Sequence, residues 1–193
     1  MKIILASNNK HKIAEINELL DNRFEVISLT EAGITEDIPE PYDTFEENAL
    51  AKAQYAFDKT GLITFSEDSG LVVPALKGAP GVFSARYAGE PRSDARNTAK
   101  LLQDLEGYAE RDAYYQTTIC LVSGAKPMYF KGTCAGTIAE NVQGEGGFGY
   151  DPIFIPQGYD QTFGQLSPAV KKSISHRAKA MALFITYIQE GLS

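Results

Sequence analysis

A short apolar run with β-branched members ends at two adjacent acids within residues 62–70. The run predicts a buried strand that delivers Glu67 and Asp68 to its carboxyl end, with Gly70 allowing a turn before a second strand at residues 71–76. Ligands of open α/β sheets bind at such strand ends. Two adjacent carboxylates repel each other, so they need a cation, a proton or solvent, and a hard divalent metal would supply the cation. Taken alone, the pair favours the alternative of a solvated acidic turn.

Length and composition restrict the class of protein. A chain of 193 residues fits one domain, which can bury roughly 70% of its unfolded surface. The net charge is −7 and the basic residues are scattered, which argues against a long nucleic acid as partner but allows a small anion chelated to metal. Cys120 and Cys134 lie in strand-like runs without metal spacing, as is typical of buried thiols in a reducing compartment. Since neither a signal peptide nor an apolar run of membrane-spanning length is found, we expect a cytoplasmic protein with no membrane partner.

The first sixty residues predict a strand, a polar loop and a helix, then a second strand and a second helix. Apolar runs predict strands at residues 2–6 and 24–29, and apolar spacing predicts a helix at residues 13–20. A helix N-terminus exposes unpaired N–H groups and a partial positive charge. The polar loop could therefore cradle a phosphate through Ser7, Asn9 and Lys12, although helix capping by Ser7 or an asparagine is equally possible.

Thr44 and Glu47 have the spacing of a capping box that opens the second helix, which Gly61 ends. Its apolar residues lie on one side, and Asn48 and Lys52 lie one turn apart on another side. A lysine in this setting is usually solvated. Lys52 gains a functional meaning only if its side of the helix faces the phosphate cradle.

The middle of the chain predicts a helix followed by a hairpin, and we expect the hairpin to be scaffold. Residues 93–105 predict a helix, and residues 114–122 and 128–135 predict two strands of a hairpin. By contrast, residues 144–152 place four glycines in six positions beside two aromatic residues and an acid. Glycines let the backbone approach a ligand closely, and Phe148 could stack on a planar ring. The alternative is a flexible loop with an aromatic anchor.

Ser167 and Pro168 predict the start of a helical segment whose apolar stripe continues to residue 188. Its first turns carry a polar and cationic cluster: Lys171, Lys172, Ser173, Ser175, His176 and Arg177. Cations at a helix start oppose the helix dipole, so a bound anion would stabilise them. A solvated basic face is an equally possible interpretation.

These segments, in this order, resemble the inosine triphosphate pyrophosphatase family, which hydrolyses ITP, dITP and XTP. Six collinear stretches carry the resemblance: residues 7–12, 44–52, 67–71, 78–87, 146–152 and 173–177. The resemblance implies an α/β fold, with an elongated mixed β-sheet flanked by helices and two lobes around a central cleft. It also implies that residues 1–193 form a single domain, usually in a homodimer.

The activity implied by the resemblance is Mg²⁺-dependent cleavage of a nucleoside triphosphate to the monophosphate and pyrophosphate, which removes deaminated purine nucleotides from the pool. Asp68 would be the proton acceptor and a magnesium ligand, and Glu40 the second magnesium carboxylate. The residues assigned to phosphates are Ser7, Asn9, Lys12, Lys52 and Lys171, with Asn8, Lys10 and His11 in the same substrate-binding segment. Those assigned to sugar and base are Ser69, Phe148, Gly149, Tyr150, Asp151, His176 and Arg177.

This sequence departs from the family pattern at two positions. Glu67 stands where bacterial members often have an aspartate, which leaves its role open, and His11 stands where glycine is common. Two other functions remain as alternatives: a Maf-type pyrophosphatase acting on pyrimidine or modified nucleotides, and a nucleotide-binding sensor without turnover. A substrate panel separates them, since a sensor would be stabilised by nucleotide without releasing pyrophosphate.

Overall fold

The computed structural model describes residues 1–20, 24–124 and 126–191, together with all side chains in these ranges except that of His11. Within these ranges, no helix is both long enough and apolar enough to cross a membrane.

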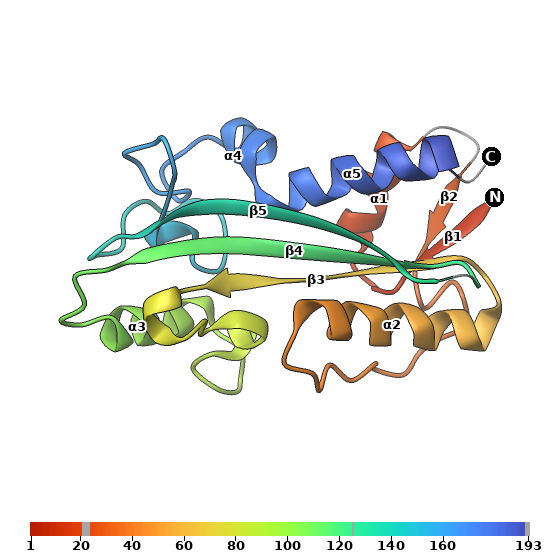
Figure 1. The fold of residues 1–193 in the computed structure, drawn as a ribbon, viewed down its shortest axis with the longest axis horizontal. Coiled ribbons are helices and arrows are strands. Elements are labelled where there is room, and N and C mark those ends of the chain that lie inside the picture. The colour runs from red at the N-terminus through yellow and green to blue at the C-terminus, as the bar shows by residue number, and fades with distance from the viewer. Residues whose placement is uncertain (21–23, 125, 192–193) are drawn as a thin grey trace. The chain divides into compact units, whose positions relative to one another are not determined.

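Over the described residues, six strands form one mixed sheet in the order β2-β1-β3-β4-β5-β6 (Figure 1). β1 pairs in parallel with β2 and β3, whereas β5 pairs antiparallel with β6. The prediction of a mixed sheet flanked by helices is therefore confirmed. The strands are β1 (Lys2–Leu5), β2 (Glu25–Ile27), β3 (Thr64–Val72), β4 (Asp112–Val122), β5 (Met128–Ile138) and β6 (Phe154–Pro156).

The α-helices of the described ranges are α1 (Lys10–Leu19), α2 (Phe45–Thr60), α3 (Asp94–Asp104), α4 (Pro168–Ile174) and α5 (His176–Gly191). The capping box of α2 is confirmed, because Thr44 Oγ1 accepts a hydrogen bond from Glu47 N and donates one to the Glu47 carboxylate. Gly61 ends this helix in the left-handed conformation, with φ of 67°. These boundaries follow from residues close together in sequence.

The chain divides into two compact units, each described by itself. Unit 1 comprises Met1–Asp68, Thr118–Lys131 and Ala180–Ser193, and unit 2 comprises Ser69–Thr117 and Gly132–Lys179. β3, β4 and β5 each contribute residues to both units.

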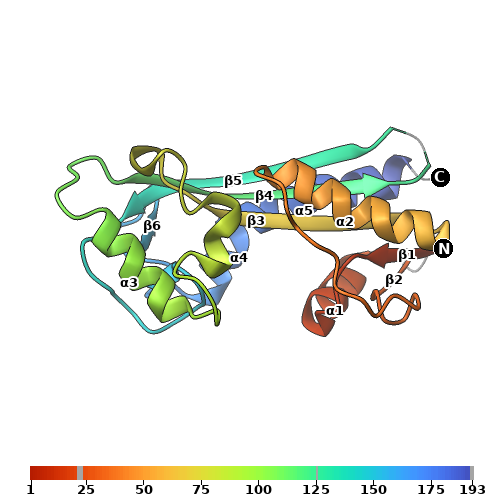
Figure 2. The same cartoon turned by 90° about the horizontal axis from the view of Figure 1, so that it is seen from below.

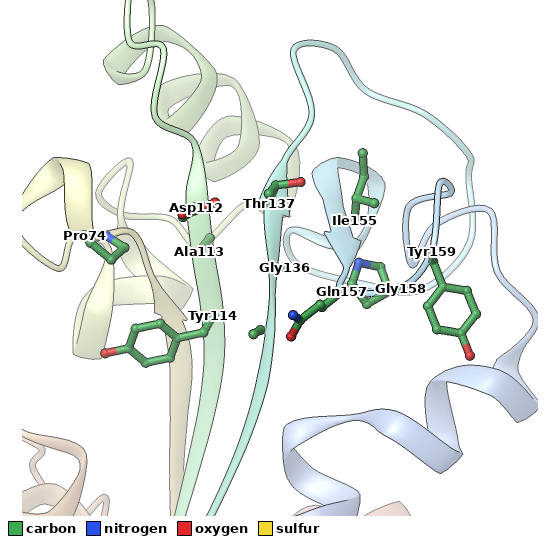
Figure 3. Close-up of a pocket in the computed structure, with 12 residues that line it drawn as sticks. Pro74, Asp112, Ala113, Tyr114, Gly136, Thr137, Ile155, Gln157, Gly158 and Tyr159 are labelled. Atoms are coloured by element: carbon green, nitrogen blue, oxygen red, sulfur yellow. The ribbon is translucent and has the colours of Figure 1, made fainter.

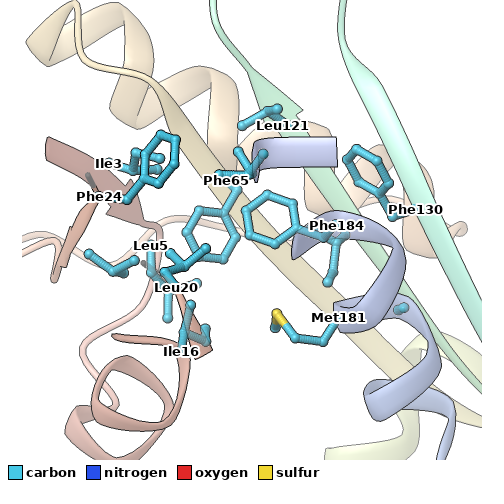
Figure 4. Close-up of a cluster of buried hydrophobic side chains, with 14 residues drawn as sticks. Ile3, Leu5, Ile16, Leu20, Phe24, Phe65, Leu121, Phe130, Met181 and Phe184 are labelled. Carbon is cyan, nitrogen blue, oxygen red and sulfur yellow. The ribbon is translucent and has the colours of Figure 1, made fainter. Parts of the chain in front are cut away.

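In unit 1, successive residues of β4 serve two hydrophobic clusters. Ile119 and Leu121 pack in a cluster with Phe65 and with Phe184 of α5 (Figure 4). Cys120 and Val122 pack instead with alanines of α2. Because side chains alternate along a strand, α2 and α5 cover opposite faces of β4 here.

The core of unit 2 includes Leu71, Leu101 and Leu105, all fully buried. Tyr115 meets Phe154 edge-on, with ring centroids 4.7 Å apart. In Figure 2, α3 lies beside the short 3₁₀ segment Gly81–Arg86. This packing fixes α3 on the body of unit 2.

Both cysteines are free and buried, as predicted. Burial raises the pKa of the Cys120 thiol to about 11, so this thiol stays protonated near neutral pH. Its environment is that of a small hydrophobic side chain.

The prediction that a strand ends at Glu67 and Asp68 is wrong. β3 continues through Gly70 to Val72, and the segment predicted as a second strand becomes a 3₁₀ turn at Pro74–Leu76. The physical reason is that β3 is anchored on both sides of the acids, by buried Phe65 in unit 1 and buried Leu71 in unit 2. The acids therefore lie in mid-strand.

The prediction of one helix after Ser167 is also wrong, since Ser175 separates α4 from α5. Ser175 has an extended backbone, and its hydroxyl accepts from Ala178 N at 3.2 Å, so it caps α5. Lys171 and Lys172 consequently lie in the last turn of α4, where the helix dipole favours cations. The helix dipole therefore gives no reason to expect a bound anion at these two lysines.

We predict that Phe184→Ala lowers the free energy of unfolding by about 3–5 kcal/mol, because it leaves a cavity beside Phe65. The adjacent Leu183 is 54% exposed, so Leu183→Ala provides a matched control with a loss of less than about 1 kcal/mol. Equilibrium denaturation with urea measures both values. Equal losses for the two variants would contradict this assignment of the core.

Candidate active site

The acids of β3 lie where the strand changes from buried to partly exposed. Residues 64–66 are buried, Glu67 and Asp68 keep a small part of their surface exposed, and Ser69 is exposed. The buried Ser66 hydroxyl donates to the carbonyl of Ala49 in α2, which ties this part of β3 to the helix. The two carboxylates therefore sit on a fixed backbone.

Lys12 forms an ion pair with Glu67, whose side chain is only 6% exposed. The lysine comes from the first turn of α1, where Asn9 Oδ1 accepts from Lys12 N at 3.2 Å. Ser7 Oγ accepts from Asn9 N at 3.2 Å. Ser7 and Asn9 thus make the local bonds expected of capping, and they also place Lys12 beside Glu67.

The polar loop contains three other predicted residues, at positions 8, 10 and 11. Asn8 Oδ1 accepts from both the backbone and the hydroxyl of Thr30, at 2.9 Å each, so this oxygen stabilises the turn after β2. Lys10 is exposed at the start of α1. The side chain of His11 lies outside the described part of the structure. The assignment of these three residues to substrate stays a prediction.

Lys52 joins the acidic loop to β3. Its ammonium pairs with the Glu40 carboxylate and donates to the Glu67 carbonyl at 2.9 Å. The side of α2 that carries Lys52 therefore does face the acids of β3. Four of the predicted residues of unit 1, Lys12, Glu40, Lys52 and Asp68, thus lie in or next to one charged cluster around Glu67.

Asn48 is a site residue whose role the sequence analysis missed. It is 1% exposed, and its amide exchanges two hydrogen bonds of 3.0 Å with the backbone of Tyr42. These bonds fix the segment that carries Glu40 against α2. The available signal was its position one turn before Lys52 on the same helix.

In unit 2, Asp151 organises the glycine-rich loop. Asp151 is 2% exposed, and its Oδ2 accepts from Phe148 N at 2.8 Å and pairs with Lys171. A Cβ at Gly147 would collide with the same carboxylate, so the loop requires glycine there. Lys171, and not the exposed Lys172, is the lysine that meets this loop.

Phe148 is held by its backbone, although the residue is 75% exposed. The Lys171 ammonium lies 4.1 Å from the ring centroid, a cation–π contact. The ring is thus available for stacking, as predicted for a base-binding residue. Tyr150, in contrast, is 3% exposed and donates to the Ser84 carbonyl at 2.7 Å. Burial raises the pKa of its hydroxyl, which therefore remains a donor.

His176 and Arg177 are the first two residues of α5, and both are half-buried. The imidazole of His176 stacks on Tyr115 with centroids 4.7 Å apart and planes 10° apart. This stacking fixes the plane of the ring. Ser69, Phe148, Lys171, His176 and Arg177 are all residues of unit 2, whereas the phosphate-assigned loop and Lys52 belong to unit 1.

The carboxylates of the site are its possible metal ligands. Across residues 1–20, 24–124 and 126–191, no group of three Asp, Glu, His or Cys side chains is placed to hold a metal ion. Magnesium, however, is usually bound by only one or two carboxylates together with substrate phosphates. The oxygen donors of Glu40 and Asp68 fit that requirement.

A separate hollow of about 530 Å³ lies on unit 2 (Figure 3). Its walls include Tyr114 of β4, Thr137 of β5 and Gln157 after β6, and it is not lined by any of the predicted site residues. Among the described residues that line it, Asp112 is the one acid and none is a lysine or an arginine. The hollow therefore lacks the charges that bind phosphate.

We predict that Lys171→Met lowers the free energy of unfolding by about 2–4 kcal/mol, because it removes the cation paired with buried Asp151. Lys172→Met is the matched control, since Lys172 is exposed and next in sequence; its effect should stay within about 0.5 kcal/mol. Urea denaturation of both variants measures the difference. A Lys171 variant as stable as the control would show that the pair contributes nothing.

Comparison with known proteins places the whole chain among similar sequences and structures. Residues 3–187 match the Ham1 family. A dITP/XTP pyrophosphatase of Flavobacterium psychrophilum is 47% identical over 189 residues, which cover 98% of this chain and 100% of the relative. The Ham1 protein of Staphylococcus aureus has a similar structure, with a TM-score of 0.94 and 40% identity over 98% of each chain. A HAM1 protein of Coxiella burnetii gives a TM-score of 0.94 and 41% identity, covering 99% of this chain and 100% of the other.

Proposed function

Because this chain belongs to the Ham1 family, we propose that it is a nucleoside triphosphate pyrophosphohydrolase that cleaves ITP, dITP and XTP to the monophosphate and pyrophosphate. Similarity to enzymes named dITP/XTP pyrophosphatase supports both the reaction and the substrate class. Its role is to remove deaminated purine nucleotides from the nucleotide pool.

The observation that carries the proposal is the charged cluster of unit 1. Lys12 and Lys52 pair with the carboxylates of Glu67 and Glu40, and Lys52 also binds the backbone of β3 next to Asp68. Such a cluster offers cations for phosphate oxygens and carboxylates for a metal ion. Phosphoryl transfer needs little more than positioning and charge neutralisation.

Glu40 and Asp68 would hold Mg²⁺. When bound, the ion would polarise phosphate oxygens. Mg²⁺ takes oxygen ligands and keeps several waters, so two carboxylates suffice when the substrate supplies the rest.

The lysines of the chain neutralise the phosphates. Before substrate binds, Lys12 and Lys52 are kept in place by Glu67 and Glu40, so little side-chain freedom is lost when a phosphate replaces or joins these partners. Asp68 orients the attacking water toward the α-phosphorus and accepts its proton, and pyrophosphate leaves as the bond between the α-phosphorus and the bridging oxygen breaks. Ser7 and Asn9 add polar contacts near the start of α1.

The nucleoside is assigned to residues of unit 2. Phe148 stacks on the base, while Ser69 contacts the sugar or base. Hypoxanthine and xanthine carry a carbonyl where adenine carries an amino group, so donors from His176 or Arg177 pair with the former and oppose the latter. Hydrogen-bond mismatches of this kind are rejected strongly, because buried donors are left without acceptors.

A homodimer and a cytoplasmic location complete the proposal. The homodimer rests on the resemblance to the inosine triphosphate pyrophosphatase family, and the location is the one that suits an enzyme acting on the nucleotide pool. Gel filtration with light scattering tests the first, and a monomer at micromolar concentration would refute it.

The proposal is tested by measuring pyrophosphate release from ITP, XTP, dITP, GTP, ATP and dUTP with Mg²⁺, and again with EDTA. We expect release from the first three substrates and its loss with EDTA, because without the metal ion the carboxylates of Glu40 and Asp68 would repel the substrate phosphates. Release confined to pyrimidine nucleotides would favour the Maf-type alternative. Stabilisation by ITP without release would favour a sensor.

We predict that Asp68→Asn lowers kcat for ITP about 10²–10⁴-fold, the usual contribution of a general base, while the thermal midpoint stays close to that of the parent. Asp160→Asn is the matched control, since Asp160 is exposed and outside the charged cluster. Initial-rate kinetics and thermal unfolding measure the two effects. A near-normal kcat for Asp68→Asn would remove Asp68 as the base.

A further inference from the structure

Gly149 is bound on both sides by α3, a helix far away in sequence. Gly149 N donates to Asp94 Oδ2 at 2.6 Å, across 55 residues of chain. The Thr98 hydroxyl donates to the Gly149 carbonyl at 3.3 Å. Asp94 and Thr98 are one helical turn apart, so both lie on the side of α3 that faces the glycine-rich loop. We call these two hydrogen bonds the Gly149 clasp.

The helix that makes the clasp is firmly anchored. Asn97 is 1% exposed; its amide donates to the carbonyls of Ser84 and Ala85, and its oxygen accepts from Ala88 N at 2.8 Å. Leu101, one turn further on, is fully buried in the core of unit 2. Asp94 therefore offers its carboxylate from a fixed position.

A hollow of about 390 Å³ lies between the loop and α3, and the clasp residues Asp94, Thr98 and Gly149 are part of its lining. Its walls include Ala95 and Leu102 of α3 on one side and Val142 and Pro152 on the other. Where the hollow lies between them, the loop and α3 gain little stability from packing against each other. The position of the loop relative to α3 consequently depends on a few directed bonds.

Phe148 lies between two such bonds. Its own N–H is held by Asp151 at 2.8 Å, and the next N–H along the chain, that of Gly149, is held by Asp94. The backbone on both sides of the exposed ring is thus fixed by carboxylates from two different parts of unit 2. A bond to an ionised acceptor is stronger than one between neutral groups.

We propose that Asp94 is a positioning residue for the nucleoside: through the Gly149 clasp it orients the Phe148 ring before the base arrives. This inference deepens the proposed function and rests on it. Asp94 acts through the loop and touches neither the phosphates nor the reacting atoms. Its loss therefore weakens binding of the nucleoside but leaves binding of pyrophosphate unchanged.

Calorimetric titration of the whole protein with IMP and, separately, with pyrophosphate tests the proposal. Asp94→Ala should weaken IMP binding about tenfold, with pyrophosphate binding within about twofold of the parent. Asp94→Asn should recover most of the IMP affinity, because its amide oxygen still accepts from Gly149 N.

In ITP hydrolysis, Asp94→Ala should raise KM about tenfold and change kcat less than about threefold.

Ser93→Ala is the matched control, because Ser93 caps the same helix by accepting from Arg96 N at 3.3 Å and takes no part in the clasp. It should lower stability without changing IMP affinity. Thr98→Val, which removes the other half of the clasp, provides a second variant and should weaken IMP binding in the same direction, by about threefold. The proposal is wrong if Asp94→Ala and Ser93→Ala have equal effects, or if Asp94→Ala weakens pyrophosphate as much as IMP.

Failure of the inference can be distinguished from failure of the proposed function. Parent protein that hydrolyses ITP while Asp94→Ala behaves identically overturns the clasp alone. Parent protein that neither hydrolyses ITP nor binds IMP overturns the proposed function, and the inference with it.

Discussion

The interaction on which the candidate site depends most is the bridge made by Lys52. One ammonium group joins the carboxylate of Glu40, on a long acidic loop, to the backbone of β3 at Glu67. Adjacent carboxylates on a strand repel each other, and the neighbouring Lys12 offsets that repulsion at Glu67. The bridge thereby holds, in one place, the negative groups that suit a metal ion and the positive groups that suit a phosphate.

Unit 2 also contains a carboxylate paired with a lysine, and there the carboxylate fixes the backbone of a loop. The buried Asp151 neutralises Lys171 and at the same time fixes the backbone of Phe148. When a buried carboxylate binds both a cation and an N–H donor, these interactions offset the free energy that its removal from water costs. If either partner is lost, part of that cost is no longer offset. With both partners in place, the result is an aromatic ring that is exposed but held on a rigid backbone, which reduces the entropy lost when a planar ligand stacks on it.

Local signals predicted much of the fold. The capping box at Thr44 and the stop at Gly61 determine the ends of α2 from residues within a few positions of each end. Long-range pairing was not predictable in this way: two acids and Gly70 suggest the end of a strand, yet β3 continues because Leu71 is buried in unit 2. The break at Ser175 was missed because the apolar spacing on its two sides is consistent with one helix.

In the candidate site, too, the sequence indicated individual residues but not the long-range contacts between them. The family resemblance indicated Lys52 and Glu40, but their pairing, the support from Asn48 and the clasp from Asp94 join residues 6 to 55 positions apart. Asp94 in particular looks like an ordinary acid in the first turn of a helix, and only the folded backbone shows that it meets Gly149.

In the proposed reaction, the lysines hold the pyrophosphate end of the substrate while Asp68 directs water to the α-phosphorus. The decisive experiment is hydrolysis of ITP in water enriched in ¹⁸O, followed by mass spectrometry of both products. We expect one ¹⁸O atom in IMP and none in pyrophosphate. Label in pyrophosphate, or release of inorganic phosphate with IDP, would contradict the proposed reaction.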